Sequence, residues 1–327
     1  MAHIVVENLV KTFEVAERQA GTWGAVRGLV RRTHRTVHAL DGISFELKPG
    51  ELVGYIGPNG AGKSTTVKTL AGILVPTSGR CEVLGRVPWR ERKTHVQQIG
   101  VVFGQRTQLW WDLPVVESFD LLRDIYRVPA DRYRMLLDEL TERLSLGSLL
   151  DTPVRQLSLG QRMRCDLAAS LLHEPPLIFL DEPTIGLDAI SKLAVREFIQ
   201  RLNRERGVTV ILTTHDMDDI EALCTRVIVI GGGKILSDGT LDALRERVTR
   251  ERWLLLDLED PYLDLQDPDA EVLRRDGQRV TLRFDPARVS PAQLISRLTA
   301  RYPIRDLFVQ NPPIEEIIAR LYGQHGE

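Results

Sequence analysis

One short segment constrains this chain more than any other, because it requires a strand before it and a helix after it. The segment Gly57-Pro58-Asn59-Gly60-Ala61-Gly62-Lys63-Ser64-Thr65 fits the pattern G-x-x-x-x-G-K-[ST]. Glycines let the backbone curl so that successive N–H groups point inward at phosphate oxygens. The apolar run 52–56 predicts a buried strand, and residues 64–73 predict a helix whose N-terminus favours anions. The segment therefore predicts a loop that holds nucleotide phosphates.

Two side chains of this loop carry its chemistry. Lys63 supplies a mobile positive charge for the terminal phosphates, and the Ser64 hydroxyl is placed to bind Mg²⁺. The alternative, a chance glycine turn before a helix, is disfavoured because strand, loop and helix follow one another in register.

Composition narrows the class of protein. The 327 residues suggest roughly two domains, and 43% hydrophobic with 27% charged residues is typical of a folded, soluble-type chain. The net charge of −2 gives no general electrostatic reason to expect nucleic-acid binding. Three scattered cysteines, Cys81, Cys165 and Cys224, favour a reducing cytoplasm over a disulfide framework or zinc site. No apolar run approaches the roughly 20 residues of a membrane helix, and the first ten residues do not resemble a secretory signal.

Short apolar runs alternate with helical patterns over most of the chain. Runs at 99–103, 177–180, 208–212 and 227–230 predict strands of a mostly parallel sheet covered on both faces. Runs at 4–6 and 43–47 predict edge strands of a first sheet. Residues 115–150 are mostly helical with a break near Pro129, and 159–172 predict another helix.

The segment 14–37 is basic, and its apolar and arginine side chains would fall on opposite faces of a helix, although three glycines weaken that prediction. Three interpretations stay open: a solvated loop, a contact with anionic lipid or a membrane protein, and a nucleic-acid contact.

The pattern changes after about residue 250. Runs at 253–258, 279–284 and 304–309 predict strands, and Ser290-Pro291 is typical of a helix start. A last helix is predicted over 314–322. The sequence therefore predicts a small α+β domain, without a cluster of candidate catalytic groups.

Two further motifs carry chemistry. The run 177–180 leads into Asp181-Glu182, so a buried strand delivers two carboxylates at its C-terminal end, where ligands of parallel sheets bind. Asp181 can hold Mg²⁺, and Glu182 can accept a proton from an attacking water. About 20 residues upstream, Leu157-Ser158-Leu159-Gly160-Gln161 precedes a helix and offers a second anion-binding end, or else a plain helix cap.

Taken together, these motifs resemble the nucleotide-binding subunit of an ABC transporter over residues 1–245. The resemblance implies an α/β P-loop ABC ATPase domain with a mixed sheet and a helical subdomain at about 108–172. The basic insert 14–37 interrupts it, and the small α+β domain 246–327 follows it.

The resemblance also implies roles for particular residues. The segment 57–65 resembles the Walker A loop, and Asp181 and Glu182 end Walker B. Gln105 resembles the Q-loop glutamine that senses Mg²⁺ and the attacking water, and His215 resembles the switch histidine. Phe13 resembles the aromatic that stacks on adenine, with Trp23 as a rival. Signature and D-loop residues are implied at four positions: Ser158, Gly160, Gln161 and Asp188. ATP and Mg²⁺ are thus the implied ligands, with Ser64, Gln105 and Asp181 around the metal and Lys63, Gln105, Glu182 and His215 as catalytic groups.

The sequences of segments 102–114 and 155–165 resemble those of bacterial drug- and viologen-exporter ATPases, which work with separate permeases. In this family two ATP-binding domains sandwich two ATP molecules, so a second subunit is expected, as a homodimer or a heterodimer. A peripheral location on the cytoplasmic face of the inner membrane follows. Trp110 and Trp111 are either core residues or part of the permease contact.

The same motifs also bear on other functions. A soluble ABC ATPase in DNA or translation processes is the alternative, but coiled-coil insertions, zinc motifs and tandem cassettes are absent from the sequence. A P-loop kinase or GTPase does not account for the signature, the switch histidine and the Asp-Glu pair. Import stays open beside export, and the transported substrate has no signal in the sequence.

Overall fold

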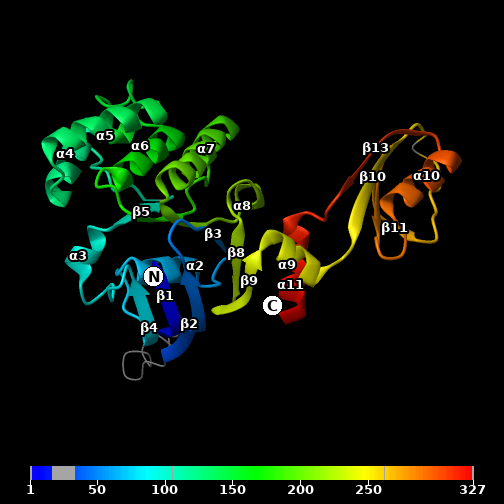
Figure 1. The fold of residues 1–327 in the computed structure, drawn as a ribbon, viewed down its shortest axis with the longest axis horizontal. Helices are drawn as coiled ribbons and strands as arrows, with labels where there is room; N and C mark the ends of the chain where they lie inside the picture. Colours follow the sequence, from blue (N-terminus) through cyan, green and yellow to red (C-terminus); the bar gives the residue numbers. More distant parts are fainter. Residues whose placement is uncertain (1, 17–33, 105, 261, 326–327) are drawn as a thin grey trace, which may run out of the picture. The chain divides into compact units, whose positions relative to one another are not determined.

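The structure, a computed structural model, describes residues 2–16, 34–104, 106–260 and 262–325. It divides into two compact units, Met1–Gly239 and Thr240–Glu327, each with its own core (Figure 1). The boundary predicted at 245 falls inside a helix of the second unit, α9 (Leu241–Val248).

A six-stranded sheet in the order β5-β6-β7-β3-β8-β9 forms the centre of the first unit. Its strands are β3 (Leu52–Ile56), β5 (Ile99–Phe103), β6 (Leu177–Asp181), β7 (Thr209–Thr213), β8 (Arg226–Gly231) and β9 (Lys234–Thr240). The pairs from β5 through β8 are parallel, and β3 and β7 are buried along their whole length. Strands covered on both faces need continuous apolar runs, which confirms the parallel sheet predicted from the sequence.

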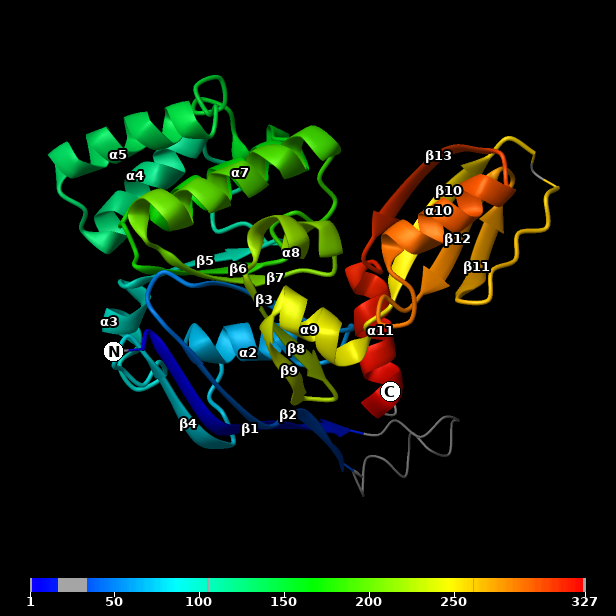
Figure 2. The same ribbon diagram turned by 45° about the vertical axis from the view of Figure 1, so that its right-hand side comes forward.

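Helices cover one face of this sheet (Figure 2). They are α4 (Val115–Tyr126), α5 (Ala130–Arg143), α6 (Leu159–Leu171), α7 (Ala189–Arg206) and α8 (Met217–Leu223), with the 3-10 turn η1 (Val154–Gln156) before α6. The helices α4 and α5 separate at Pro129, which caps α5 and has no N–H to continue a helix.

On the other face, α2 (Lys63–Leu70) lies between the central sheet and a second, antiparallel sheet (Figure 2). This sheet has the order β2 (His34–Leu47), β1 (Ile4–Ala16), β4 (Ser78–Val83). A single apolar core joins the three layers and includes Leu47, Val53, Leu70 and Phe179. The short helix α3 (Arg92–Val96) precedes β5, and β4 spans Ser78–Val83.

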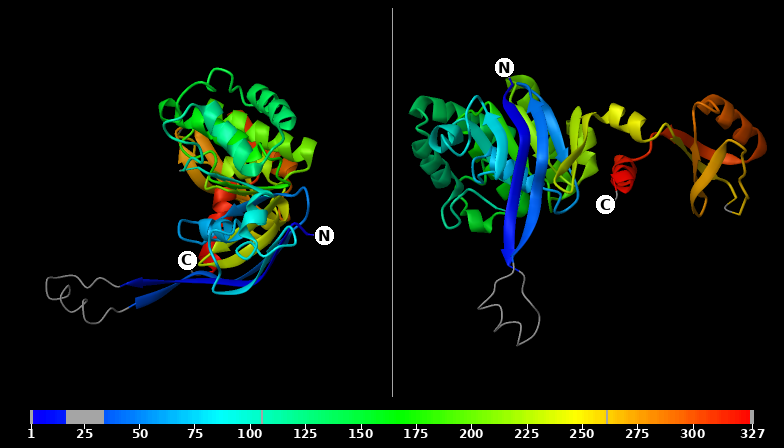
Figure 3. Two further views of the ribbon diagram at one scale, coloured as in Figure 1. Left: turned by 90° about the vertical axis from the view of Figure 1, so that its left-hand side faces the viewer. Right: turned by 90° about the horizontal axis from the view of Figure 1, so that it is seen from below.

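The antiparallel sheet corrects one prediction and adds to another. The first strand, β1 (Ile4–Ala16), is the central strand of this sheet and not an edge strand. It also runs on beside β2 (His34–Leu47) (Figure 3). There Phe13 lies opposite Val37 and Glu14 opposite Thr36. The described ends of the insert 14–37 are therefore paired strands, whose ladder satisfies their backbone groups. Residues 17–33 lie outside the described part.

The second unit is an antiparallel sheet in the order β11-β12-β10-β13, packed on α10 (Pro291–Arg301). Its strands are β10 (Arg252–Leu258), β11 (Ala270–Asp276), β12 (Arg279–Phe284) and β13 (Ile304–Gln310). The predicted cap Ser290 accepts a hydrogen bond from the Gln293 N–H in a capping box. The helix α11 (Ile314–His325) ends the unit. Within the described residues, no helix combines the length and the apolar character needed to cross a membrane.

Candidate nucleotide site

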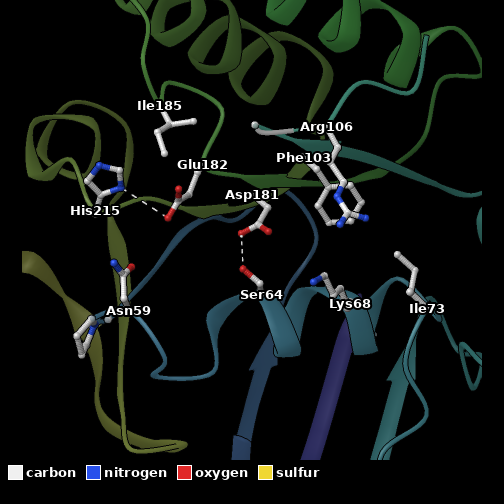
Figure 4. A pocket seen from close by; sticks show the side chains of 13 residues that line it. Asn59, Ser64, Lys68, Ile73, Phe103, Arg106, Asp181, Glu182, Ile185 and His215 are labelled. Atoms are coloured by element: carbon white, nitrogen blue, oxygen red, sulfur yellow. Dashed lines mark hydrogen bonds and ion pairs between the residues drawn. The ribbon is translucent and has the colours of Figure 1, made fainter. Parts of the chain in front are cut away.

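Three parallel strands end at one edge of the central sheet and bring distant segments together there. The phosphate loop follows β3, Asp181 and Glu182 close β6, and the segment 213–215 closes β7. These ends surround a cleft of ≈ 760 Å³ (Figure 4). The cleft is lined by Gly57, Pro58, Asn59, Ser64, Lys68, Ile73, Phe103, Gly104, Arg106, Asp181, Glu182, Ile185 and His215. This edge is where open α/β sheets bind their ligands.

The phosphate loop is shaped by glycine geometry at the start of α2. Gly62, the N-cap, has φ 110°, and a Cβ there would lie 2.5 Å from the Ala39 carbonyl oxygen. Only glycine fits both the positive φ and the close backbone contact. Of the other predicted loop residues, Gly60 has φ 85°, Ala61 is buried, and Thr65 lies in the first turn of α2.

Lys63 is held close to its own loop. Its Nζ donates to the carbonyl oxygens of Gly57 at 2.6 Å and Pro58 at 3.1 Å. Burial lowers the pKa of Lys63 below its usual value, and the negative charges of Glu182 and Asp181 oppose that shift. A phosphate group entering the loop would replace two neutral acceptors with charged oxygens, which bind an ammonium group more strongly.

The two carboxylates have different surroundings. The Asp181 Oδ1 accepts hydrogen bonds from Ser64 Oγ at 3.3 Å and Thr213 Oγ1 at 2.5 Å. Glu182 points toward His215, with 3.6 Å between Glu182 Oε1 and His215 Nδ1 (Figure 4). Asp181 is thus fixed on the phosphate-loop side, while Glu182 is directed into the cleft and keeps acceptor capacity for a water molecule.

The backbone at Glu182 is unusual and closely packed. Its φ is 56°, in the left-handed region that few non-glycine residues adopt, and its N–H donates to the Thr213 carbonyl at 2.9 Å. On the neighbouring strand end, a Cβ placed on Gly104 would lie 2.0 Å from the Glu182 carbonyl oxygen. The absence of a side chain at Gly104 therefore allows the backbone of Glu182 to take this path.

The donor set beside the loop fits a magnesium ion. Ser64 and Asp181 present a hydroxyl and a carboxylate oxygen 3.3 Å apart, and hard divalent cations prefer oxygen ligands of this kind. Gln105, the third predicted ligand, lies outside the described residues.

The signature residues form a separate group. Ser158 caps α6: its Oγ accepts from the Gln161 N–H at 3.2 Å, and the Gln161 Oε1 accepts from the Ser158 N–H at 2.9 Å. Asp188 caps α7 and accepts from the N–H and the hydroxyl of Ser191. A Cβ on Gly160 would lie 2.5 Å from Ser191 Oγ, so the starts of the two helices are packed together. The described residues that line the cleft include none of these four predicted positions.

The stacking of an aromatic side chain on adenine, predicted for Phe13, stays a prediction. Phe13 lies on β1 opposite Val37, half-exposed, with the Lys11 ammonium 5.0 Å from its ring centroid. Phe13 is not among the residues that line the cleft, and its rival Trp23 lies outside the described residues.

Some side chains of the site were not singled out from the sequence. Lys68 lies one turn beyond Ser64 on α2, and Arg106 follows β5; both add positive charge to the cleft. Thr213 holds Asp181, and its position at the end of β7, two residues before the predicted His215, is the signal that could have identified it.

A glycine-rich phosphate loop, an Asp-Glu pair and a facing histidine at the edge of a parallel sheet define a P-loop nucleotide-binding protein. Comparison with known proteins narrows this class. The ABC transporter family model matches residues 40–185. The Nod factor export ATP-binding protein I of Burkholderia pseudomallei (strain 1710b) is 35% identical over 290 residues, which cover 87% of this chain and 92% of that protein. The chain belongs to the family of ABC transporter ATP-binding proteins.

Two further comparisons agree. The probable multidrug ABC transporter ATP-binding protein YbhF of Escherichia coli (strain K12) is 38% identical over 209 residues, 63% of this chain, and the match spans 35% of YbhF. Among solved structures, the dimeric ATP-binding cassette MJ0796 in a post-hydrolysis state with ADP and Pi has a TM-score of 0.61 at 26% identity, covering 73% of this chain and 98% of that one. The first unit thus has the fold of an ABC ATPase cassette.

Proposed function

We propose that this chain is the ATP-hydrolysing subunit of a membrane ABC transporter that exports drug-like or other small molecules. The observation that carries the proposal is the Glu182 carboxylate, directed into the cleft beside His215 and across from the phosphate loop. The export direction is supported by the name of one relative, which refers to Nod factor export, and the drug-like cargo by the name of the other, which refers to a multidrug transporter. Neither name refers to DNA or translation.

In this proposal the residues of the cleft divide the work of phosphoryl transfer. The loop N–H groups and Lys63 bind the phosphates, and Glu182 accepts a proton from the attacking water while His215 orients it. Ser64 and Asp181, with Gln105, would hold Mg²⁺, which neutralises charge on the phosphate oxygens when bound. The protein forms no covalent bond to the substrate in this mechanism. Positioning of the reactants and stabilisation of charge therefore account for most of the rate enhancement.

The proposal is tested by Glu182→Gln, which keeps the shape of the side chain and removes the base. We expect ATP binding to persist while turnover falls by at least ~10²–10⁴, the usual contribution of a general base. Radiolabelled ATP hydrolysis and equilibrium binding of ATP measure the two effects. Glu142→Gln, an exposed position on α5, is the matched control and should hydrolyse ATP at the wild-type rate. Wild-type turnover by Glu182→Gln would refute the assignment of the base.

A second ATP-binding subunit is part of the proposal. Ser158, Gly160, Gln161 and Asp188 present helix N-termini away from the cleft of their own chain, and such termini bind anions. We infer that they complete the nucleotide site of another subunit, and a homodimer is the simplest arrangement. The dimeric form of the MJ0796 cassette supports this reading.

A permease is the other partner that we propose for this chain. Five large hydrophobic side chains on or near α4 and α5 are exposed: Trp110, Trp111, Leu121, Ile125 and Met135. Trp111 is half-exposed and lies 5.6 Å from the Arg162 guanidinium on α6, so this surface adjoins the signature helix. We infer that it receives a membrane subunit, which would place the chain peripherally on the cytoplasmic face of the inner membrane.

A further inference from the structure

A buried carboxylate that the proposed chemistry does not use lies behind the His215 loop. Asp219, on α8, has no exposed surface. Its two oxygens accept from three side chains: Thr184 Oγ1, Thr214 Oγ1 at 3.2 Å, and Arg196 Nε at 2.5 Å. A buried ion is costly unless donors surround it, and here all three donors are themselves buried or nearly so.

The three donors come from three different parts of the site. Thr184 lies two residues after Glu182, and Thr214 directly precedes His215. Arg196 belongs to α7, the helix that Asp188 caps, and its Nη2 also lies 3.5 Å from Asp216 Oδ1. One carboxylate therefore joins the turn after the base, the loop of the switch histidine and the helix of the D-loop.

The same loop is reinforced at its backbone. The Asp216 N–H donates to Thr214 Oγ1 at 2.9 Å, and Lys192 of α7 forms an ion pair with Asp216. The Thr214 hydroxyl thus serves both the loop backbone and Asp219. A change of charge at Asp219 would therefore alter the position of the loop that carries His215. The His215 Nδ1 lies 3.6 Å from Glu182 Oε1.

We propose that Asp219 is a positioning residue for ATP hydrolysis, which sets the His215 loop against the Glu182 turn; the inference rests on the function proposed above. It does not touch the cleft, so it acts on catalysis only through these two residues. Loss of its charge should change the rate of the chemical step and leave nucleotide binding in the phosphate loop intact.

The test is Asp219→Asn, with Asp218→Asn, its exposed neighbour on α8, as the matched control. For Asp219→Asn we expect kcat to fall at least ~10-fold, about the effect of losing one hydrogen bond to a charged group. The KM for ATP should change less than ~3-fold. The control should match wild type in both constants.

Two further variants make the result decisive. Thr184→Val removes a single donor to Asp219, so it should give the same split between kcat and KM even where Asp219→Asn does not fold. In the Glu182→Gln background, Asp219→Asn should cause no further loss, because groups that act as a unit are not additive. A proportional change in kcat and KM, or additive losses, would overturn the positioning role. An inactive wild-type protein would instead refute the proposed function.

Discussion

At the scale of single residues, the most exacting contact of the site is between two backbones. Gly104 and Glu182 directly follow the adjacent strands β5 and β6, and a Cβ on Gly104 would meet the Glu182 carbonyl oxygen at 2.0 Å. Since the obstacle is backbone, no side-chain rotation can relieve it. Glu182 already has a positive φ, so displacement of its carbonyl would redirect the carboxylate as well.

Gly104→Ala should therefore reduce both stability and turnover. Overpacking of this kind costs about 1–3 kcal/mol, and a small displacement of a catalytic group lowers rates by ~10²-fold. Urea unfolding and steady-state ATP hydrolysis measure the two effects. Gly147→Ala is the control, because its Cβ would have ordinary contact only, 4.0 Å from Thr141 Cγ2. A Gly104→Ala protein as active as wild type would show that the strand ends can separate freely.

The sequence predicted some residues of the site better than others, for a physical reason. Gly57, Ser64, Asp181 and His215 belong to local patterns at strand ends, and parallel strands bring such ends to one edge. Thr213 and Asp219 act through hydrogen bonds to residues 32 and 35 positions away, and no local pattern encodes such pairs. Gln105 stays a prediction.

At the scale of elements, His173 links three of them. It follows α6, its Nε2 donates to the Ile99 carbonyl of β5 at 2.9 Å, and its ring stacks on Tyr126 of α4 with centroids 3.9 Å apart. Burial lowers the pKa of His173 from 6.5 to about 4. The folded protein therefore favours the neutral imidazole, and the unfolded chain binds the proton more readily.

This shift predicts a loss of stability in mild acid. Between pH 6.5 and about 4 the unfolded chain is protonated at His173 and the folded chain is not, so the free energy of unfolding falls as pH falls. At 1.36 kcal/mol per pH unit, the loss approaches ~3 kcal/mol. His173→Gln should flatten this dependence in urea titrations across pH 7 to 4. An unchanged dependence of the unfolding free energy on pH would mean that His173 is protonated in the folded protein. Part of the dependence that remains in His173→Gln comes from buried His95, whose pKa is also lowered.

The elements that sequence patterns missed are those with weak hydrophobic signals. The strand β11 is exposed along most of its length and carries mainly charged and polar side chains, so it has no apolar alternation. The continuation of β1 and β2 beyond the core is likewise exposed and depends on pairing with the partner strand. Buried strands such as β5 and β6, in contrast, were predicted to within a residue, because burial requires a continuous apolar run.

At the scale of the whole molecule, the second unit has a complete core of its own between α10 and the faces of β10 and β12. The start of this unit at Thr240 precedes the predicted boundary because α9 packs with α11 and buries Leu244. An amphipathic helix gives no sequence signal of which neighbour it will join, so its assignment depends on tertiary contacts.

The proposed permease surface is tested by Trp110→Ala combined with Trp111→Ala. Both side chains are well exposed in the chain alone, and large aromatics of this kind dominate interface energies, at about 2 kcal/mol or more each. We expect co-purification with the cognate permease to weaken by at least ~10-fold, while nucleotide binding is kept. Tyr262→Ala, the removal of an aromatic that is 91% exposed in the second unit, should leave assembly unchanged. Undiminished assembly of the double variant would place the contact elsewhere.

The N-termini of the helices that carry the signature and D-loop residues do not line the cleft of their own chain. This separation has a genetic consequence. If each nucleotide site borrows Ser158 and Gly160 from a second copy, a defective copy also spoils the sites of the intact copies with which it pairs. An allele encoding a defect in these supplied residues, such as Ser158→Arg, expressed beside the wild-type allele, would then be dominant, since its product brings the altered residue to the intact copy's site in mixed pairs. Recessive inheritance of the same defect would be the mark of a chain that works alone.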